Sequence, residues 1–290
     1  MAMRTAVLLV LLLSPAAALR AAEPEWFPGA TTFLPPLASP EESRISAQQQ
    51  IGSTNLRVGL GAVPDLVRLT YAGGGQLSVG LDAWAFALSS TIAGARLKID
   101  LVDGSFGAHV TWTDSSSWSA RFRALHISAH IADGTYDQGS GEWLPDRTPI
   151  PFSRNFFELT GAYTVPAPFF LRPYGQVAAA WFNRPKEIQT LAFGLGADAA
   201  LRTNPSPYTS VHFALLGVPE YAGTVTAEAG VRFGRWEENG LRVYCGFTSG
   251  LESYGQFYNR RVTFWSVGAS FDLWRITGGA AATMSGVFPR

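Results

Sequence analysis

The amino-acid sequence predicts an all-β fold, an antiparallel transmembrane β-barrel of about 12 strands, and three observations lead to it. Only 15% of the 290 residues are charged, against about 25% in an ordinary soluble domain. Apolar and small polar side chains alternate with a period of two over most of the chain. After the first twenty positions there is no run of about 18 apolar residues, so membrane-spanning helices are not expected.

The first 22 residues are typical of a secretory signal peptide. Arg4 supplies a positive charge, residues 6–13 are apolar, and residues 14–18 are small, as a cleavage site of A-x-A type requires. We expect cleavage after Ala18 or near Ala22. Together with the predicted barrel, this signal predicts a location in the outer membrane of a Gram-negative-type bacterium. Membrane lipid and the barrel assembly machinery are the expected partners.

Residues 23–43 form a segment rich in proline, which cannot be a central strand or a long helix because proline lacks a backbone N–H. We expect this segment to be a periplasmic strap or plug. The barrel is predicted over residues 44–274, and residues 275–290 are expected to form a C-terminal tail.

Each predicted strand ends where the alternation meets a cluster of turn-forming residues. The strands expected, in order, are 44–52, 54–71, 76–89, 103–113, 117–132, 152–165, 169–182, 190–201, 208–218, 223–235, 239–249 and 262–274. The alternation is complete in residues 224–234, where one face is apolar and the other carries Gly, Thr and single charges. The apolar faces are expected to contact lipid and the polar faces to line the lumen. A soluble sandwich would instead carry more Lys and Glu outside.

Connection lengths support the same topology. The short connections 113–117, 165–168, 202–207 and 237–240 fall at one end of the predicted barrel, and the long ones 133–151 and 250–261 at the other. Outer-membrane barrels have short periplasmic turns and long extracellular loops. We therefore expect both termini on the periplasmic side.

Net charge and cysteine content exclude other classes of protein. The 22 basic and 22 acidic residues balance, which does not suit a nucleic-acid-binding protein. The single cysteine, Cys245, excludes a disulfide scaffold and a zinc site built from cysteines. No cofactor is expected.

Four motifs also resemble a known family. They are Trp26-Phe27-Pro28 with the segment from Phe33 to Pro40, the segment from Leu125 to Asp133, Arg172-Pro173-Tyr174-Gly175, and the segment from Gly250 to Tyr258. In this order they resemble a bacterial envelope family of unknown function, number twelve-oh-seven in the series of domains of unknown function. The sequence departs from the family pattern at Ala129, where Ser is expected, and at Ala132, where Gly is expected. The resemblance implies no activity.

One strand carries a candidate catalytic group. His126, Ser128 and His130 share a face because they are two residues apart. If the long loop joins strands 117–132 and 152–165 at their outer ends, Glu158 is expected opposite His126. A hydroxyl, an imidazole and a carboxylate are the parts of a Ser-His-acid hydrolase, with Ser128 as nucleophile, His126 as base and Glu158 as third member.

A second candidate for the third member is Asn155. A His-x-Ser pair on a barrel strand, with an acid or amide on the next strand, resembles outer-membrane phospholipase A and the lipid A deacylase. By this resemblance Asn155 would orient His126.

The expected face of this strand argues against a hydrolase. Leu125, Ile127, Ala129 and Ile131 suit lipid, so His126 and Ser128 are expected in the lumen, whereas those two lipases act on their outer surface. Arg121 and Arg123 are interpreted as interfacial. A lumenal polar cluster is expected from His130, Asp133, Glu228 and Arg232.

A metal site is not expected, although His126, His130 and Asp133 carry suitable ligand groups. Two histidines four residues apart on a strand lie about 13 Å apart, which is too far to share an ion. The sequence therefore favours a structural barrel or a narrow binding or passage barrel without catalytic activity. An ester hydrolase acting on lipid or lipopolysaccharide is the alternative.

Overall fold

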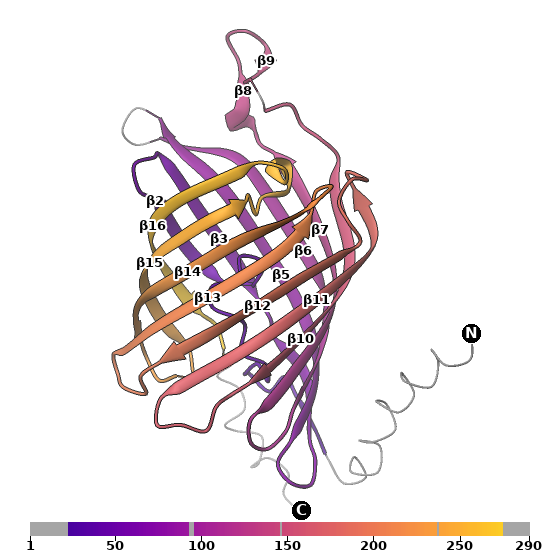
Figure 1. Ribbon diagram of the computed structural model, residues 1–290, viewed down its shortest axis with the longest axis vertical. Coiled ribbons are helices and arrows are strands. Elements are labelled where there is room, and N and C mark those ends of the chain that lie inside the picture. The colour runs from indigo at the N-terminus through magenta and orange to yellow at the C-terminus, as the bar shows by residue number, and fades with distance from the viewer. Residues whose placement is uncertain (1–22, 93–95, 146, 237, 275–290) are drawn as a thin grey trace, which may run out of the picture.

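The computed structural model describes residues 23–92, 96–145, 147–236 and 238–274. In this part of the chain, twelve antiparallel strands close into a tilted barrel, as predicted (Figure 1). The strands are β2 (Ile45–Gln50), β3 (Asn55–Ala62) with its continuation β4 (Asp65–Thr70), β5 (Gln76–Ile92), β6 (Arg96–Thr113), β7 (Trp118–Ile131), β10 (Phe152–Tyr163), β11 (Phe170–Arg184), β12 (Leu191–Ala200), β13 (Ser206–Gly217), β14 (Tyr221–Phe233), β15 (Gly240–Leu251) and β16 (Arg261–Asp272). β2 pairs with β16, which closes the ring.

Two strand boundaries differ from the sequence expectation. The expected strand 54–71 is interrupted at Val63 and Pro64, because Pro64 has no N–H to continue the ladder. Its two halves, β3 and β4, both pair with β5. β5 and β6 pair as far as Ile92 and Arg96, although residues 90–102 were expected outside the strands. A strand that extends beyond the lipid can carry the charged residues of this stretch.

The outer surface of the barrel is apolar. On β14, β15 and β16 the predicted faces are confirmed: Val243 and Val267 are exposed, whereas Arg242 and Ser266 are buried inside. Large exposed apolar side chains occur on most of the strands; examples are Leu60, Leu81, Val110, Phe122, Leu159, Trp181, Leu195, Val211, Phe233, Val243 and Trp265. We call this surface the apolar belt. No helix in the described ranges is long and apolar enough to cross a membrane.

The two ends of the barrel differ. One end has short turns, such as residues 114–117 and 234–239. The other has the long connections 132–151 and 252–260. The first long loop carries the small hairpin of β8 (Tyr136–Asp137) and β9 (Glu142–Trp143), which stands above the rim (Figure 1).

The proline-rich part of the chain enters the barrel. β1 (Pro24–Trp26) pairs with β4, and Phe27 beside it is still 74% exposed. Residues 30–44, which we call the lumenal segment, then lie inside. Phe33 and Glu42 are each 1% exposed, and the backbone N–H of Leu37 donates to Asp198 Oδ1 at 3.2 Å. The residues that hold this segment belong to the short-turn half of the lumen. The expected signal peptide and C-terminal tail lie outside the described residues, and the division of the chain stays a prediction.

The long connection 252–260 folds back into the other end of the barrel, and we call it the inward loop. It contains the short 3-10 helix η3 (Gly255–Phe257), whose residues are buried. Gln256 Nε2 donates to the carbonyl oxygen of Ala129 at 2.6 Å, and the N–H of Gly255 donates to Asp103 Oδ2 at 2.7 Å. The inward loop therefore packs against β6 and β7.

Candidate active site on the outer face

The two faces of β7 are the reverse of those expected. Arg121 and Arg123 are 1% and 0% exposed, and they point into the lumen together with Leu125, Ile127 and Ala129. His126, Ser128 and His130 therefore share the outer face with the exposed Phe122. The interpretation of the two arginines as interfacial is wrong.

The arginines explain this reversal. Arg121 pairs with Glu42 of the lumenal segment, and Arg123 Nη2 lies 2.6 Å from Glu158 Oε1. An arginine on the lipid face costs about 2–4 kcal/mol near the bilayer midplane, whereas inside the barrel these two meet carboxylates. Residues two apart on a strand point to the same face, so Leu125 and Ile127 lie on the same side of β7 as the two arginines. Inside the barrel, Ile127 packs in an apolar cluster with Trp84 and Phe156.

The strand register excludes Glu158 as the partner of His126. β10 pairs with β7 so that Asn155 is opposite His126 and Glu158 is opposite Arg123. The Glu158 carboxylate accepts hydrogen bonds from Arg123 Nε at 3.0 Å and Nη2 at 2.6 Å inside the lumen. The expected Ser-His-Glu arrangement is therefore wrong, because the path of loop 132–151 shifts the register by three residues.

Asn155 does contact His126. His126 Nδ1 lies 2.6 Å from Asn155 Oδ1. An amide oxygen only accepts hydrogen bonds, so Nδ1 carries the hydrogen and Nε2 is left as the basic nitrogen. In this contact Asn155 orients the imidazole of His126 and sets its tautomer.

Ser128 lies between two imidazoles on the same face. Its Oγ is 3.3 Å from His130 Nε2, and within the described chain no hydrogen bond joins it to His126. The Cα atoms of residues two apart on a strand are separated by about 7 Å, a distance that side-chain rotation can bridge. Transfer of the Ser128 proton to His126 therefore requires the Ser128 hydroxyl to turn away from His130.

Cross-strand neighbours shape the surroundings of this group. Phe106, His126, Asn155 and Phe182 form one row across β6, β7, β10 and β11, and Gly104, Ser128, Ser153 and Arg184 form the next. The Phe106 ring is 65% exposed and its centroid lies 4.9 Å from that of His126. Among the described atoms none lies within 4 Å of a Cβ placed on Gly104, so the space beside Ser128 is open. We call these two rows the outer patch.

The expected lumenal polar cluster divides between the two sides of the wall. Glu228 and Arg232 lie inside, where Glu228 pairs with Arg242, and Arg232 Nε lies 3.3 Å from Asp272 Oδ2. His130 is exposed on the outer face, and Asp133 is exposed in the loop after β7. Placing His130 and Asp133 in the lumen is therefore wrong. Where the chain is described, no three His, Cys, Asp or Glu side chains are grouped to hold a metal ion.

Sequence reasoning missed the main charged group of the lumen. Asp82, Arg123, Glu158 and Glu42 form one ionic network, with Arg123 Nη1 3.4 Å from Asp82 Oδ1 and Arg123 Nη2 3.2 Å from Glu42 Oε1. The signal in the sequence was the spacing of Arg121 and Arg123, two charges on one face of a membrane strand. Glu42 had no such signal because its segment has no strand periodicity.

A closed barrel with an apolar outer surface and charges inside is an outer-membrane-like β-barrel. The chain belongs to the family described as "Protein of unknown function (DUF1207)", which matches residues 17–273 and confirms the resemblance seen in the sequence.

Two solved structures are similar to the chain. One is the β domain of the Bordetella autotransporter BrkA, with 15% identity over 78% of this chain and 94% of that chain and a TM-score of 0.46. The other is OmpT, an outer membrane protein of Vibrio cholerae, with 9% identity over 79% of this chain and 94% of that chain and a TM-score of 0.37. No curated protein matches the chain.

Proposed function

We propose that this protein is an outer-membrane hydrolase that cleaves ester bonds of membrane lipids at its outer surface. Ser128 is the nucleophile, His126 the general base and Asn155 the group that orients His126. One observation carries the proposal: the 2.6 Å contact between His126 Nδ1 and Asn155 Oδ1 on the lipid-facing side, next to Ser128. The expected lumenal position of these residues was the main argument against a hydrolase, and it no longer applies.

The reaction follows from the roles of these groups. His126 Nε2 takes the proton of Ser128 as Oγ attacks the ester carbonyl, and a tetrahedral intermediate forms. Its collapse breaks the bond to the alcohol, which leaves with the proton from His126. Water, deprotonated by His126, then attacks the acyl-Ser128 ester, and the bond to Ser128 Oγ breaks as His126 returns the proton to Oγ, which releases the fatty acid. Asn155 keeps His126 in the reactive tautomer through both steps.

The outer patch supports a lipid as substrate. His126 and Ser128 lie near the end of β7 that leads into the long loop, so they lie near one edge of the apolar belt, the level of lipid ester bonds. Phe106 and Phe182 end the row of His126 and offer apolar contact for an acyl chain. Arg184, exposed at the end of the Ser128 row, is suited to a phosphate headgroup.

The second candidate is the function that the sequence favoured, a structural barrel or a narrow binding or passage barrel. It is supported by the hydrogen bond that joins Ser128 to His130 and not to His126. In this case the outer patch is a polar rim at the membrane surface and the protein has no esterase activity.

Both candidates assume a location in the outer membrane, which the apolar belt supports. The barrel assembly machinery and outer-membrane lipid remain the proposed partners. Density-gradient separation of inner and outer membranes tests this location. Recovery of the folded barrel in the inner-membrane fraction would contradict it.

The deciding experiment measures fatty-acid release from phospholipid and from lipopolysaccharide by the purified full-length protein. We expect Ser128→Ala and His126→Ala each to abolish release, with no further loss in the double variant, because the two residues act as a unit. Asn155→Ala should lower the rate less. His130→Ala should keep or raise it, because Ser128 is then free to turn to His126.

Matched controls separate chemistry from folding. Ser153→Ala removes an outward hydroxyl in the same row as Ser128, and Glu158→Gln alters the carboxylate first expected in the triad. Both should retain activity, and every variant should keep the heat-modifiable mobility of a folded barrel. Release that survives Ser128→Ala contradicts the assignment. If the wild-type protein releases no fatty acid, the hydrolase assignment is wrong and the non-catalytic barrel is the function that remains.

A further inference from the structure

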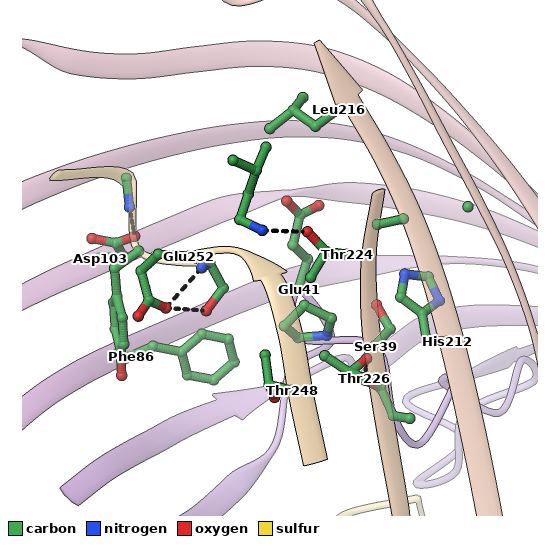
Figure 2. Close-up of a pocket in the computed structure, with 18 of the residues that line it drawn as sticks. Ser39, Glu41, Phe86, Asp103, His212, Leu216, Thr224, Thr226, Thr248 and Glu252 are labelled. Atoms are coloured by element: carbon green, nitrogen blue, oxygen red, sulfur yellow. Dashed lines mark hydrogen bonds between the residues drawn. The ribbon is translucent and has the colours of Figure 1, made fainter. Parts of the chain in front are cut away.

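A cavity occupies the half of the lumen that the lumenal segment leaves open. Ser39 and Glu41 of that segment form its floor, and Tyr254 and Tyr258 of the inward loop contribute to its roof. About 1840 Å³ of space between these groups is free of atoms, part of it open to solvent. Figure 2 shows Phe86 and Asp103 on one side of this space, His212 on the opposite side and Glu41 between them.

One wall of the cavity is built from two neighbouring rows of inward side chains on β5, β6, β7 and β10. The first row is Phe86, Asp103, Ala129 and Phe152, and the second is Trp84, Ser105, Ile127 and Arg154. The rings of Trp84 and Phe86 are stacked, with centroids 4.4 Å apart. The wall therefore presents flat apolar surface between its polar groups.

Four polar atoms in these two rows have no hydrogen-bond partner among the described residues. They are Trp84 Nε1, Asp103 Oδ1, Ser105 Oγ and Arg154 Nε. Their residues are only 3–7% exposed. A buried polar group without a partner is unfavourable, and native proteins contain few of them. Three of these residues, Trp84, Asp103 and Arg154, line the cavity, and their concentration there indicates a binding site.

The other charged groups around the cavity already have partners. Arg57 binds Glu252 through two hydrogen bonds of 2.8 and 2.7 Å, while Glu158 and Glu228 pair with Arg123 and Arg242. Arg154 forms no hydrogen bond within the described ranges, and its nearest carboxylate, Glu41 of the floor, is 4.0 Å away. One oxygen of Asp103 accepts from Gly255, and the other is unpaired. The wall thus offers one cation that forms no hydrogen bond in the described part of the chain, and one carboxylate oxygen that accepts none.

We propose that this cavity binds a small aromatic carboxylate that also carries a hydroxyl group. The carboxylate contacts the Arg154 guanidinium and the Trp84 N–H, the ring packs on Phe86 and Phe152, and the hydroxyl donates to Asp103 Oδ1. Arg154 and Asp103 are two strands and one row apart, so their Cα atoms are separated by about 12 Å. With both side chains reaching inward, a single-ring compound spans the remaining distance. This site is independent of the outer patch, which lies on the other side of the wall.

The test is calorimetric titration of the full-length barrel in lipid nanodiscs with three matched probes. 4-Hydroxyphenylacetate carries both polar groups, phenylacetate lacks the hydroxyl, and tyramine replaces the carboxylate with an ammonium. We expect 4-hydroxyphenylacetate to bind most tightly and phenylacetate more weakly, and tyramine not to bind. Absence of 4-hydroxyphenylacetate binding, or preferential binding of tyramine, would overturn the proposal.

Variants assign each contact. Arg154→Gln should weaken binding of both carboxylates at least about tenfold, because it removes a charge-assisted hydrogen bond. Trp84→Phe, which keeps an aromatic ring, should weaken both carboxylates to a similar extent. Asp103→Asn should reduce the preference for 4-hydroxyphenylacetate over phenylacetate. Glu41→Gln should tighten binding of both, because it removes the carboxylate that competes for Arg154.

Two controls complete the design. Arg235→Gln makes the same chemical change at a side chain that is 82% exposed, and it should bind the probes as the wild type does. Ser128→Ala should also bind them normally, so a failure of the hydrolase assay leaves this site unaffected. Equal affinity in Arg154→Gln and wild type would overturn the proposed site.

Discussion

Single residues in the lumen show why buried charges occur here in groups. Arg123 is fully buried and lies within 3.4 Å of carboxylate oxygens of Glu158, Glu42 and Asp82. A buried charge is tolerated only when it is paired and hydrogen-bonded, and the loss of one partner leaves the others unpaired. Glu42 is the member of this group that joins the lumenal segment to the barrel wall.

The first prediction concerns Glu42. Glu42→Ala should lower the free energy of unfolding by about 3 kcal/mol, because it leaves Arg121 and Arg123 short of a carboxylate. Urea titration of the barrel in lipid vesicles measures this loss. Glu142→Ala, on the exposed hairpin above the rim, is the control and should be neutral. Equal stability of the two variants would show that Glu42 does not anchor the segment.

The same contact predicts a pH dependence. Burial alone would raise the pKa of Glu42, but Arg121 and Arg123 hold it below the ordinary glutamate value of 4.5. Because the pKa is lower in the folded state, ionised Glu42 stabilises the fold fully above about pH 4.5, and this contribution is lost as the pH falls below it. The stability difference between wild type and Glu42→Gln should therefore shrink in acid. A difference that grows in acid would contradict the assigned charge.

At the scale of the strand, a clear alternation predicts the face and a mixed one does not. β14 has charges on one face only, and its residues face as predicted. In β7 each face carries both polar and apolar residues, so the choice of face depends on which polar groups find partners. The arginines find carboxylates inside the barrel. On the outer face, His126 contacts Asn155, and Ser128 contacts His130.

The apolar belt can be tested on β14. Ala229→Arg places a charge on the lipid-facing surface and should lower the free energy of unfolding of the barrel in vesicles by about 2–4 kcal/mol. Ala229→Leu keeps the site apolar and should be neutral. Folding titrations of both variants measure the difference. An unchanged stability of Ala229→Arg would mean that this face does not contact lipid.

At the scale of the whole molecule, we expect the lumenal segment to block the barrel. Replacing residues 30–43 with a Gly/Ser sequence of equal length removes Phe33, Leu37 and Glu42, which fill the short-turn half of the lumen. We expect the single-channel conductance in planar bilayers to rise well above that of the wild type. The same replacement of residues 138–145, an exposed part of the outer loop, should have no effect. Equal conductance of the two variants would contradict a plug.

The orientation of the barrel gives the last prediction. In a Cys245→Ala background, Ser140→Cys lies in the long loop and Ser116→Cys in a short turn, and both positions are exposed. An impermeant thiol reagent should label Ser140→Cys on intact cells and leave Ser116→Cys unlabelled until the cells are opened. Labelling of Ser116→Cys alone would mean that the barrel is inverted.

The sequence by itself determined the barrel class, the number of strands and the positions of the two long loops, but not the short connection between β5 and β6. These features are local, because the period of two and the turn clusters depend only on near neighbours. The family resemblance was also readable from short motifs.

Only the tertiary structure decided the face of β7 and the partner of His126. Both depend on residues far apart in the chain: Glu42, Asp82 and Glu158 draw Arg123 inside, and the path of loop 132–151 brings Asn155 opposite His126. The cavity wall likewise needs the register of β5, β6, β7 and β10. A one-residue change in strand phase moves every side chain to the other side of the wall, so a local pattern with two mixed faces cannot determine the site.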